Sequence, residues 1–541
     1  MTAEIAEALG AEVIRHERNI GYGAALCKST TLISSASINS GEELVRNSCP
    51  INKIIYPVLT FILPLIVRSI PEILAWPWPI GFDPIAFYVP WIMKGRPLNL
   101  GLIEMLKGTR LFSLLALAAN SLIRDPILTV KVLGPILYAF LGLSMYLFAS
   151  RALKWPPKKC FFLVLVCSLY FVSLRISWEM YRQMLGTIFL LLTLTAYHCS
   201  RSKMLPLIIV FSILTAFSHE IATVILVAIL LAEVIRCSMR KDLEKLPSSV
   251  FPFLIVSAIL ANMLYDPGTH VVRLPLEGLR GDWFTLARFI LGFLAYCYIF
   301  LLPFSIYGAL KVRNKCVHYW SISTLFIGSL WPLLNPQFSP PLWYRWIIFA
   351  VYPMSIYFVE GIYHTLTSRT NIPKVVKVLA GALVAFIALS AVWYLVAPPE
   401  DAFPYFSSYN PYKAYIQSSM LQSTIPIDDI DDVLASLDWI SENAAGECVL
   451  VLHEAFYPWS LLRGRGRCKV MRIVERNLSS PTRKTFADEL TKISKEVSEN
   501  GETVYTIWWV DGKGWYNVPS LPNSFKLLTS YGDIAIYTYA G

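Results

Sequence analysis

The chain has 541 residues, of which 55% are hydrophobic, 13% aromatic and only 16% charged, and its mean hydropathy is +0.52. Because soluble domains carry about 25% charged residues, this composition excludes an ordinary soluble protein and predicts a polytopic membrane protein. The formal net charge is +10, but residues 398–541 hold 13 basic and 18 acidic side chains. The positive excess therefore belongs to the apolar region, and we expect no nucleic-acid partner.

The first 50 residues are polar and are predicted to form a cytoplasmic N-terminal segment. Within them, residues 2–26 (TAEIAEALGAEVIRHERNIGYGAAL) resemble part of the nucleotide-sugar-binding domain of family 2 glycosyltransferases, the group that includes dolichyl-phosphate mannose synthase. The match lacks that family's Asp-rich turn and Asp-x-Asp metal site, so no catalytic residue carries over. A fused or truncated remnant is one interpretation, and chance similarity of a short helix and turn is the other.

Residues 51–397 are predicted to form the membrane domain. A helix needs about 20 apolar residues, within a range of about 17–25, to cross a bilayer. We predict about eleven crossings, three of them short, at 54–70, 127–150, 160–177, 183–198, 204–218, 220–235, 249–265, 289–310, 317–334, 346–363 and 375–397.

Basic residues predict the orientation, because Lys and Arg stay on the cytoplasmic side of a membrane. The run from Leu111 to Ile123 is too short to cross, so we interpret it as a juxtamembrane helix on the outer face. The N-terminus is then cytoplasmic, and everything after Pro398 is extracytoplasmic. The predicted cytoplasmic loops carry Arg151, Lys154, Lys158, Lys159, Arg201, Lys203, Arg236, Arg240, Lys241, Lys245, Lys311, Arg313, Lys315, Arg369, Lys374 and Lys377.

Asp83 lies in a loop rich in Pro and Trp, WPWPIGFDPIAFY (76–88), near the start of a long first outer loop, residues 71–126. Ionisable groups near the hydrocarbon are costly and tend to mark sites of chemistry or transport. Further polar groups gather at the outer ends of the predicted spans, which predicts a site at the membrane surface. They are Tyr88, Glu104, Lys107, Arg110, Glu179, Arg182, His219, Glu220 and Arg345.

Basic residues also occur on the predicted outer side, where the positive-inside rule does not explain them. They indicate an anionic ligand on that side. The set is Arg68, Lys94, Arg96, Lys107, Arg110, Arg124, Arg175, Arg182, Arg273, Arg280, Arg288 and Arg345.

From Pro398 onward the apolar spans end, and residues 398–541 are predicted to form a small extracytoplasmic α/β domain. Cys448 and Cys468 each begin a predicted strand, so a disulfide between them and two free thiols are both open interpretations. Asn477 begins a glycosylation sequon. Strands are predicted at 447–452, 468–474, 503–509 and 533–539, and helices around 430–443 and 482–499.

The order of these features resembles the GT-C class of polytopic glycosyltransferases, the broad group of protein O-mannosyltransferases and lipid A aminoarabinose transferases. The resemblance covers residues 54–541 in layout and implies a polyprenyl-phosphate sugar donor, dolichyl or undecaprenyl, and a first-loop Asp that acts at the acceptor. It rests on a long first outer loop and an external C-terminal α/β domain, together with Asp83, Glu179, His219 and Arg345 in that order at the outer turns.

The reaction implied is transfer of the sugar, with inversion, to an acceptor hydroxyl of a protein, a lipid or a glycan. Asp83 is the predicted base, and a loop cap before Pro84 is the alternative. Cations suit a phosphate leaving group, so this hypothesis requires no metal and no cofactor. The predicted phosphate ligands are Arg345, Lys107, Arg110 and Arg182, and the predicted substrate contacts are Glu179, His219, Glu220, Tyr88 and Glu104.

Structural alternatives to these roles stay open: an interfacial anchor for Arg345, a mutual pair for Glu179 and Arg182, a hydrogen-bonded interfacial His219, and an aromatic belt that includes Tyr88.

Two other functions also stay open, a transporter or flippase for lipid-linked glycans and a non-catalytic membrane scaffold. Transporters usually show repeated halves and broken helices, and the sequence has no such internal symmetry. Trp508, Trp509 and Asp511 are similar to the Trp-Trp-Asp motif of oligosaccharyltransferase catalytic subunits, but Val510 interrupts it. The first loop also lacks that family's metal-binding carboxylate pair, so we set sequon glycosylation aside.

Overall fold

The computed structural model describes residues 50–95, 109–199, 204–265, 279, 282–340, 342–367, 372–397, 404–406, 412, 416, 424–444, 446–463, 466–473, 486–510 and 520–541. The chain divides into two compact units, residues 1–58 and 59–541. Of the first unit, only residues from Pro50 onward are described. Residues 2–26, Glu104, Lys107, Asn477 and Asp511, all singled out in the sequence, lie outside the described residues.

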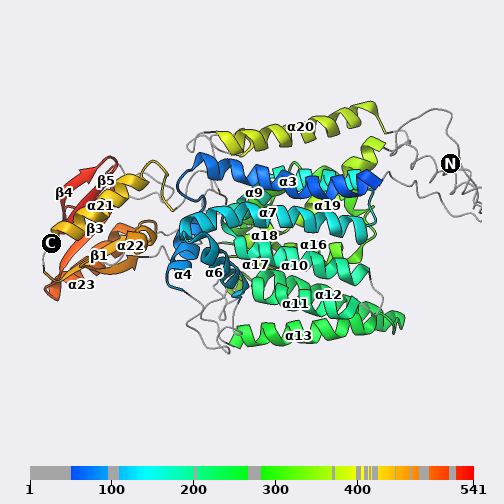
Figure 1. Ribbon diagram of the computed structural model, residues 1–541, viewed down its shortest axis with the longest axis horizontal. Helices are drawn as coiled ribbons and strands as arrows, with labels where there is room; N and C mark the ends of the chain where they lie inside the picture. The colour runs from blue at the N-terminus through cyan, green and yellow to red at the C-terminus, as the bar shows by residue number, and fades with distance from the viewer. Residues whose placement is uncertain are drawn as a thin grey trace, which may run out of the picture. The chain divides into compact units, whose positions relative to one another are not determined.

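The apolar region is a bundle of helices, coloured from blue at α3 to yellow-green at α20 (Figure 1). Within it α10 packs against α7, α11 and α12. The elements are α3 Pro50–Leu74, η1 Pro84–Tyr88, α4 Val89–Met93, α6 Leu111–Ile123, α7 Pro126–Arg151, α8 Pro157–Leu169, α9 Phe171–Glu179, α10 Tyr181–His198, α11 Leu205–Ser218, α12 Glu220–Arg240, α13 Leu246–Tyr265, α14 Trp283–Tyr298, α15 Leu302–Ala309, α16 Lys315–Leu325, η4 Phe326–Leu330, α17 Trp331–Leu334, η5 Pro336–Phe338, α18 Trp343–Phe349, α19 Val351–Thr367, α20 Lys374–Val396 and η6 Pro404–Phe406.

The chain is a polytopic helical membrane protein, but the predicted count of eleven crossings is wrong. Among the described residues, six helices are long and apolar enough to cross a membrane, or eight if each of two bent pairs is one crossing. The three other predicted spans fall short for different reasons. α10 begins with the polar run Tyr181-Arg182-Gln183, α11 has only 14 residues, and the segment predicted at 317–334 is interrupted by the π-helix η4.

Two predicted spans are bent where their helices break. α8 and α9 meet at 67° and α14 and α15 at 85°. A break frees backbone carbonyls, which must find partners in an apolar surrounding, and tyrosine hydroxyls supply them here. Tyr138 Oη donates to the Ser168 carbonyl at 3.0 Å, and Tyr170 Oη donates to the Cys297 carbonyl at 2.5 Å. Tyr170 therefore ties the first break to the second.

The C-terminal region contains a mixed sheet of order β2-β1-β3-β5-β4. β1 pairs in parallel with β2 and β3, whereas β5 pairs antiparallel with β3 and β4. The predicted strands and helices are present with small shifts, while β4 and α22 were not predicted. The elements are α21 Ile430–Asn443, β1 Cys448–His453, α22 Tyr457–Arg463, β2 Lys469–Ile473, α23 Phe486–Glu499, β3 Thr503–Trp509, β4 Phe525–Tyr531 and β5 Ile534–Tyr539.

Cys448 and Cys468 form a disulfide, with their Cα atoms 4.6 Å apart, and are not two free thiols. The Trp508-Trp509 pair belongs to the core of this sheet. Both rings are fully buried, and Trp509 Nε1 donates to Asp429 Oδ2 at 3.3 Å. These tryptophans therefore have a packing role in the fold.

Candidate functional site

The loop that carries Asp83 is anchored by a buried group of charges. Arg68 and Glu72 lie one turn apart on α3 and pair at 2.7 Å, and Lys131 of α7 reaches Glu72 at 3.2 Å. Lys131 Nζ also donates to the Trp78 carbonyl at 2.5 Å. Because a buried ammonium needs several acceptors, these contacts hold the loop at the end of α3 and α7.

Gly81 brings this loop against the end of α9. Its φ is +92°, a backbone conformation that favours glycine. A Cβ atom added to Gly81 would lie 2.5 Å from the Trp178 carbonyl oxygen and 2.7 Å from Glu179 Cγ. Only glycine fits this contact, so the loop places Asp83, two residues further on, beside Glu179.

Asp83 precedes Pro84 at the start of η1, yet its side chain makes no capping hydrogen bond. The alternative role as a loop cap therefore has no support in the geometry. The carboxyl is half-buried, and desolvation raises its pKa to about 6, against the opposing charge of Arg345. The negative charge of Glu179 raises the pKa further, whereas Arg175 and Arg182 lower it. Asp83 is thus a carboxyl poised to bind a proton near neutral pH.

Two ion pairs with buried carboxylates lie around this carboxyl. Glu179 pairs with Arg175, one turn earlier on α9, at 2.7 Å. Arg182, in the first turn of α10, pairs with Glu220 at 3.0 Å and also bonds the Thr109 hydroxyl. The mutual pairing of Glu179 and Arg182 considered from the sequence is wrong, because each has a different partner.

Several buried polar atoms in this group have no hydrogen-bond partner among the described residues. They belong to arginines, an imidazole and an amide, all groups that can bind an anion or a hydroxyl. Buried polar groups normally have hydrogen-bond partners, so these atoms are available to contact a ligand. They are Arg175 Nε and Nη1, Arg182 Nε, Gln183 Nε2 and Oε1, His219 Nδ1 and Arg345 Nε.

Tyr88 and His219 are both buried at the edges of the group. Tyr88 Oη donates to the Glu179 carbonyl at 2.8 Å, and its ring stacks on Tyr181 with centroids 5.2 Å apart. Tyr88 therefore positions the end of α9 and is no member of an exposed aromatic belt. His219 is the residue between α11 and α12, makes no capping hydrogen bond through its side chain, and packs against Gly186 of α10.

The structure thus brings together Asp83, Glu179, Arg182, Glu220 and Arg345, which come from four separate parts of the chain. Arg110 is the half-buried residue before α6. Glu104 and Lys107 cannot be placed, since both lie outside the described residues. Sequence reasoning did not assign a site role to Arg175, Thr109 or Gln183. Only Arg175 carried a signal: it belongs to the basic set on the predicted outer side, and its spacing of four residues from Glu179 brings two side chains together on a helix.

Among the described residues, no three His, Cys, Asp or Glu side chains form a group that could hold a metal ion. Comparison of the sequence with models of known protein families gives no match, and comparison with curated proteins gives no significant match. The resemblance to the GT-C class therefore stays a prediction.

Proposed function

We propose that the protein is an inverting glycosyltransferase that moves a sugar from a polyprenyl phosphate, dolichyl or undecaprenyl, to an acceptor hydroxyl of a protein, lipid or glycan. The observation that carries the proposal is the state of Asp83. It is a half-buried carboxyl without a capping bond, its pKa is raised to about 6, and arginines lie within electrostatic range. A base and a set of cations are the two requirements of this reaction.

In the proposed step, the acceptor hydroxyl gives its proton to the Asp83 carboxylate while its oxygen bonds to the anomeric carbon. The bond from that carbon to the phosphate oxygen breaks on the opposite face, which inverts the configuration. The phosphate monoester leaves with the electron pair, and Arg345 is the proposed ligand for its charge, with Arg182, Arg110 and Lys107 as further cations. Arg suits phosphate because its planar fork donates two parallel hydrogen bonds.

We further propose that this end of the bundle faces the extracytoplasmic side of a cell membrane. α7 runs from Pro126 near the Asp83 loop to Arg151, and α12 runs from Glu220 to Arg240. The ends away from Asp83 therefore carry the basic loops that favour the cytoplasm. The disulfide between Cys448 and Cys468 agrees with an extracytoplasmic C-terminal domain, because such bonds persist in oxidising compartments.

The test is Asp83→Asn in the full-length protein reconstituted with a polyprenyl-phosphate sugar. We expect transfer to fall by about 10² to 10⁴-fold, the usual worth of a general base. Asp282→Asn is the matched control, because Asp282 is an exposed carboxylate that caps α14 and Asn caps a helix equally well. Unchanged transfer by Asp83→Asn would overturn the role of Asp83 as the base, whereas no transfer by the unmodified protein would favour the scaffold hypothesis.

One specific observation favours the alternative of a transporter or flippase: the two bent helix pairs described above. Broken helices are common in transporters, where they line the substrate path. Proteoliposomes loaded with a fluorescent lipid-linked glycan separate the two functions. Movement of the lipid across the bilayer without sugar transfer, unaffected by Asp83→Asn, favours the flippase, whereas transfer without such movement favours the transferase.

A further inference from the structure

A cavity of about 680 Å³ lies at the other end of the bundle, where α7, α10 and α12 end and α8, α13 and α16 begin. Seven of its lining side chains are basic and two are acidic. α12 carries Glu220 of the Asp83 group and Glu233 of the cavity, 13 residues apart. That spacing is about 20 Å along a helix, so the cavity is separate from the proposed active site.

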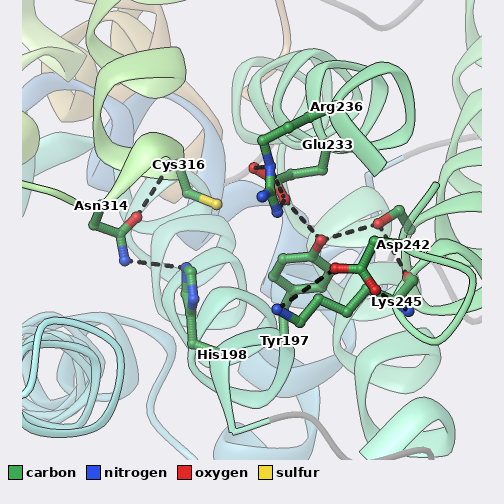
Figure 2. A network of polar contacts seen from close by, with 9 residues as sticks. Tyr197, His198, Glu233, Arg236, Asp242, Lys245, Asn314 and Cys316 are labelled. Carbon is green, nitrogen blue, oxygen red and sulfur yellow. Dashed lines mark hydrogen bonds and ion pairs between the residues drawn. The ribbon is translucent and has the colours of Figure 1, made fainter. Parts of the chain in front are cut away.

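The two acids of the cavity are fully engaged with neighbours. Glu360 pairs with Lys159 at 2.7 Å, and the Lys159 ammonium also lies 4.0 Å from the centre of the Trp155 ring. Glu233 accepts from Tyr197 Oη at 2.8 Å and pairs with Arg236, as Figure 2 shows. Both carboxylates are therefore balanced by a cation of their own.

Four further cations of the cavity have no carboxylate partner among the described residues. Lys154, Lys311, Arg313 and Lys315 are exposed, and none of them forms an ion pair with a residue that the structure describes. Charges of one sign that line a concave surface reinforce one another and raise the local concentration of counter-ions. The cavity thus has an unmatched positive potential.

The walls that carry these cations are held in place. Asn314 Oδ1 accepts from the Cys316 backbone N–H at 3.0 Å, and Asn314 Nδ2 donates to His198 Nε2 at 3.0 Å (Figure 2). The same amide lies 3.4 Å from the Ala152 carbonyl at the end of α7. Asn314 therefore fixes the loop of Arg313 and Lys315 against α7 and α10.

Lys154 adopts a left-handed backbone, with φ +57°, just after the end of α7. Glycine most often fills such a position, because any side chain is strained there. Sorting of Lys and Arg to one side of the membrane explains the sign of charge at this end. It explains neither the convergence of the cations on a cavity nor a lysine at a position that favours glycine.

We infer that this cavity binds an organic phosphate that carries at least two negative charges. Its volume lies within the range of about 300–1,000 Å³ that small-molecule sites occupy and exceeds what an inorganic ion needs. Arginine and lysine are the residues that bind phosphate. The same chemistry belongs to a phospholipid headgroup and to a soluble sugar phosphate, and the experiment separates these two sources.

The experiment uses the full-length protein in two settings. In neutral detergent, fructose 1,6-bisphosphate is titrated by calorimetry. In phosphatidylcholine nanodiscs, the shift of the unfolding temperature on adding phosphatidic acid is measured. We expect binding in at least one arm, and a loss of at least about tenfold in affinity when Lys311, Arg313 and Lys315 are all changed to Gln. The charge-matched control changes Lys158, Arg240 and Lys374 to Gln, all exposed and outside the cavity, and is expected to bind normally.

Lys154→Gly is a second variant, which separates a loss of binding from a loss of folding. It removes a cation of the cavity and at the same time relieves the strained backbone, so the protein should stay folded. It is expected to weaken binding about threefold without loss of folded protein. The control is Arg124→Gly, which relieves a similar left-handed position at the end of α6. Binding of the bisphosphate alone assigns a soluble ligand, and binding of phosphatidic acid alone assigns a headgroup.

Equal loss in both triple variants, or no binding in either arm, overturns the inference. Asp83→Asn is expected to bind both probes normally, so this result stands or falls independently of the proposed transferase activity.

Discussion

The two ends of the helix bundle use the same residue types in opposite ways. At the Asp83 end, arginines are matched by buried carboxylates, Arg175 by Glu179 and Arg182 by Glu220. At the other end, Lys154, Lys311, Arg313 and Lys315 are exposed, without an ion pair in the described part of the chain. Buried pairs fix geometry, which a reaction at a single carboxyl requires, whereas unpaired cations supply attraction, which suits capture of an anion.

The largest effect is expected from Glu179→Gln, which tests whether the pairs at the Asp83 end fix the geometry. Both side chains of the Arg175–Glu179 pair are under 10% exposed, so the change leaves a buried guanidinium without its counter-charge. We expect a loss of about 3–5 kcal/mol in the free energy of unfolding, measured in mixed micelles.

The control for this prediction is Glu496→Gln, which breaks an exposed pair with Lys492 on α23. Exposed pairs contribute at most about 1 kcal/mol, so little change is expected. If Glu179→Gln lowers the free energy of unfolding no more than Glu496→Gln does, the pairs at the Asp83 end do not fix its geometry.

Arg345→Gln is expected to have the next largest effect. A hydrogen bond to a charged group contributes about 1.5–3 kcal/mol, so kcat/KM for the donor should fall about 10 to 150-fold, with partial recovery in Arg345→Lys. Arg288→Gln removes an exposed arginine of α14 and should leave kcat/KM unchanged. An equal fall in both variants would mean that general surface charge, and not a contact by Arg345, holds the phosphate.

A smaller effect is expected from pH. The pKa of Asp83 is raised to about 6, so the carboxyl is protonated and inactive as a base below that pH and is ionised above it. We expect kcat/KM to be about tenfold lower at pH 5 than at pH 7. A profile that is flat between these values, or that rises toward acid, would contradict the role of Asp83 as base.

The smallest effect is expected from Lys154→Gly at the basic end. A residue with a side chain pays about 1–2 kcal/mol to adopt the left-handed conformation. Glycine avoids this strain, but it loses more conformational entropy on folding, which offsets part of the gain. We expect a gain of about 1 kcal/mol in the free energy of unfolding, and a similar gain for Arg124→Gly at the other end. A loss of stability in Lys154→Gly alone would mean that the lysine side chain packs in a way that outweighs the strain.

The sequence predicted the elements of the C-terminal sheet well where a strand is a short, largely apolar and buried run, as in β1 and β3. It missed β4, because that strand is mostly exposed and shows no alternation of apolar and polar residues. The bend between α8 and α9 was also missed. The residues at that break are Leu169, Tyr170 and Phe171, and without Gly or Pro nothing in the sequence marks it.

The candidate site shows a similar limit. Residue type and membrane position singled out Asp83, Glu179, Arg182 and Arg345, but the partners were not predictable. Arg345 acts on Asp83 across 262 positions of the chain, and no local pattern encodes a contact of that kind. The choice of Arg175 over Arg182 as the partner of Glu179 depends on the start of α10 at Tyr181, which separates Arg182 from the helix of Glu179.

The disulfide between Cys448 and Cys468 also holds an edge strand of the sheet in place. β2 is an edge strand of the sheet, and Cys468 directly precedes it, so the bond prevents β2 from detaching and exposing the backbone of β1. At the opposite edge, β4 has an irregular register between Leu527 and Thr529 and an exposed Lys526. Irregularity and charge both discourage the addition of a further strand. At one edge the disulfide thus holds β2 against β1, and at the other edge the irregular register and charge of β4 discourage the addition of a further strand.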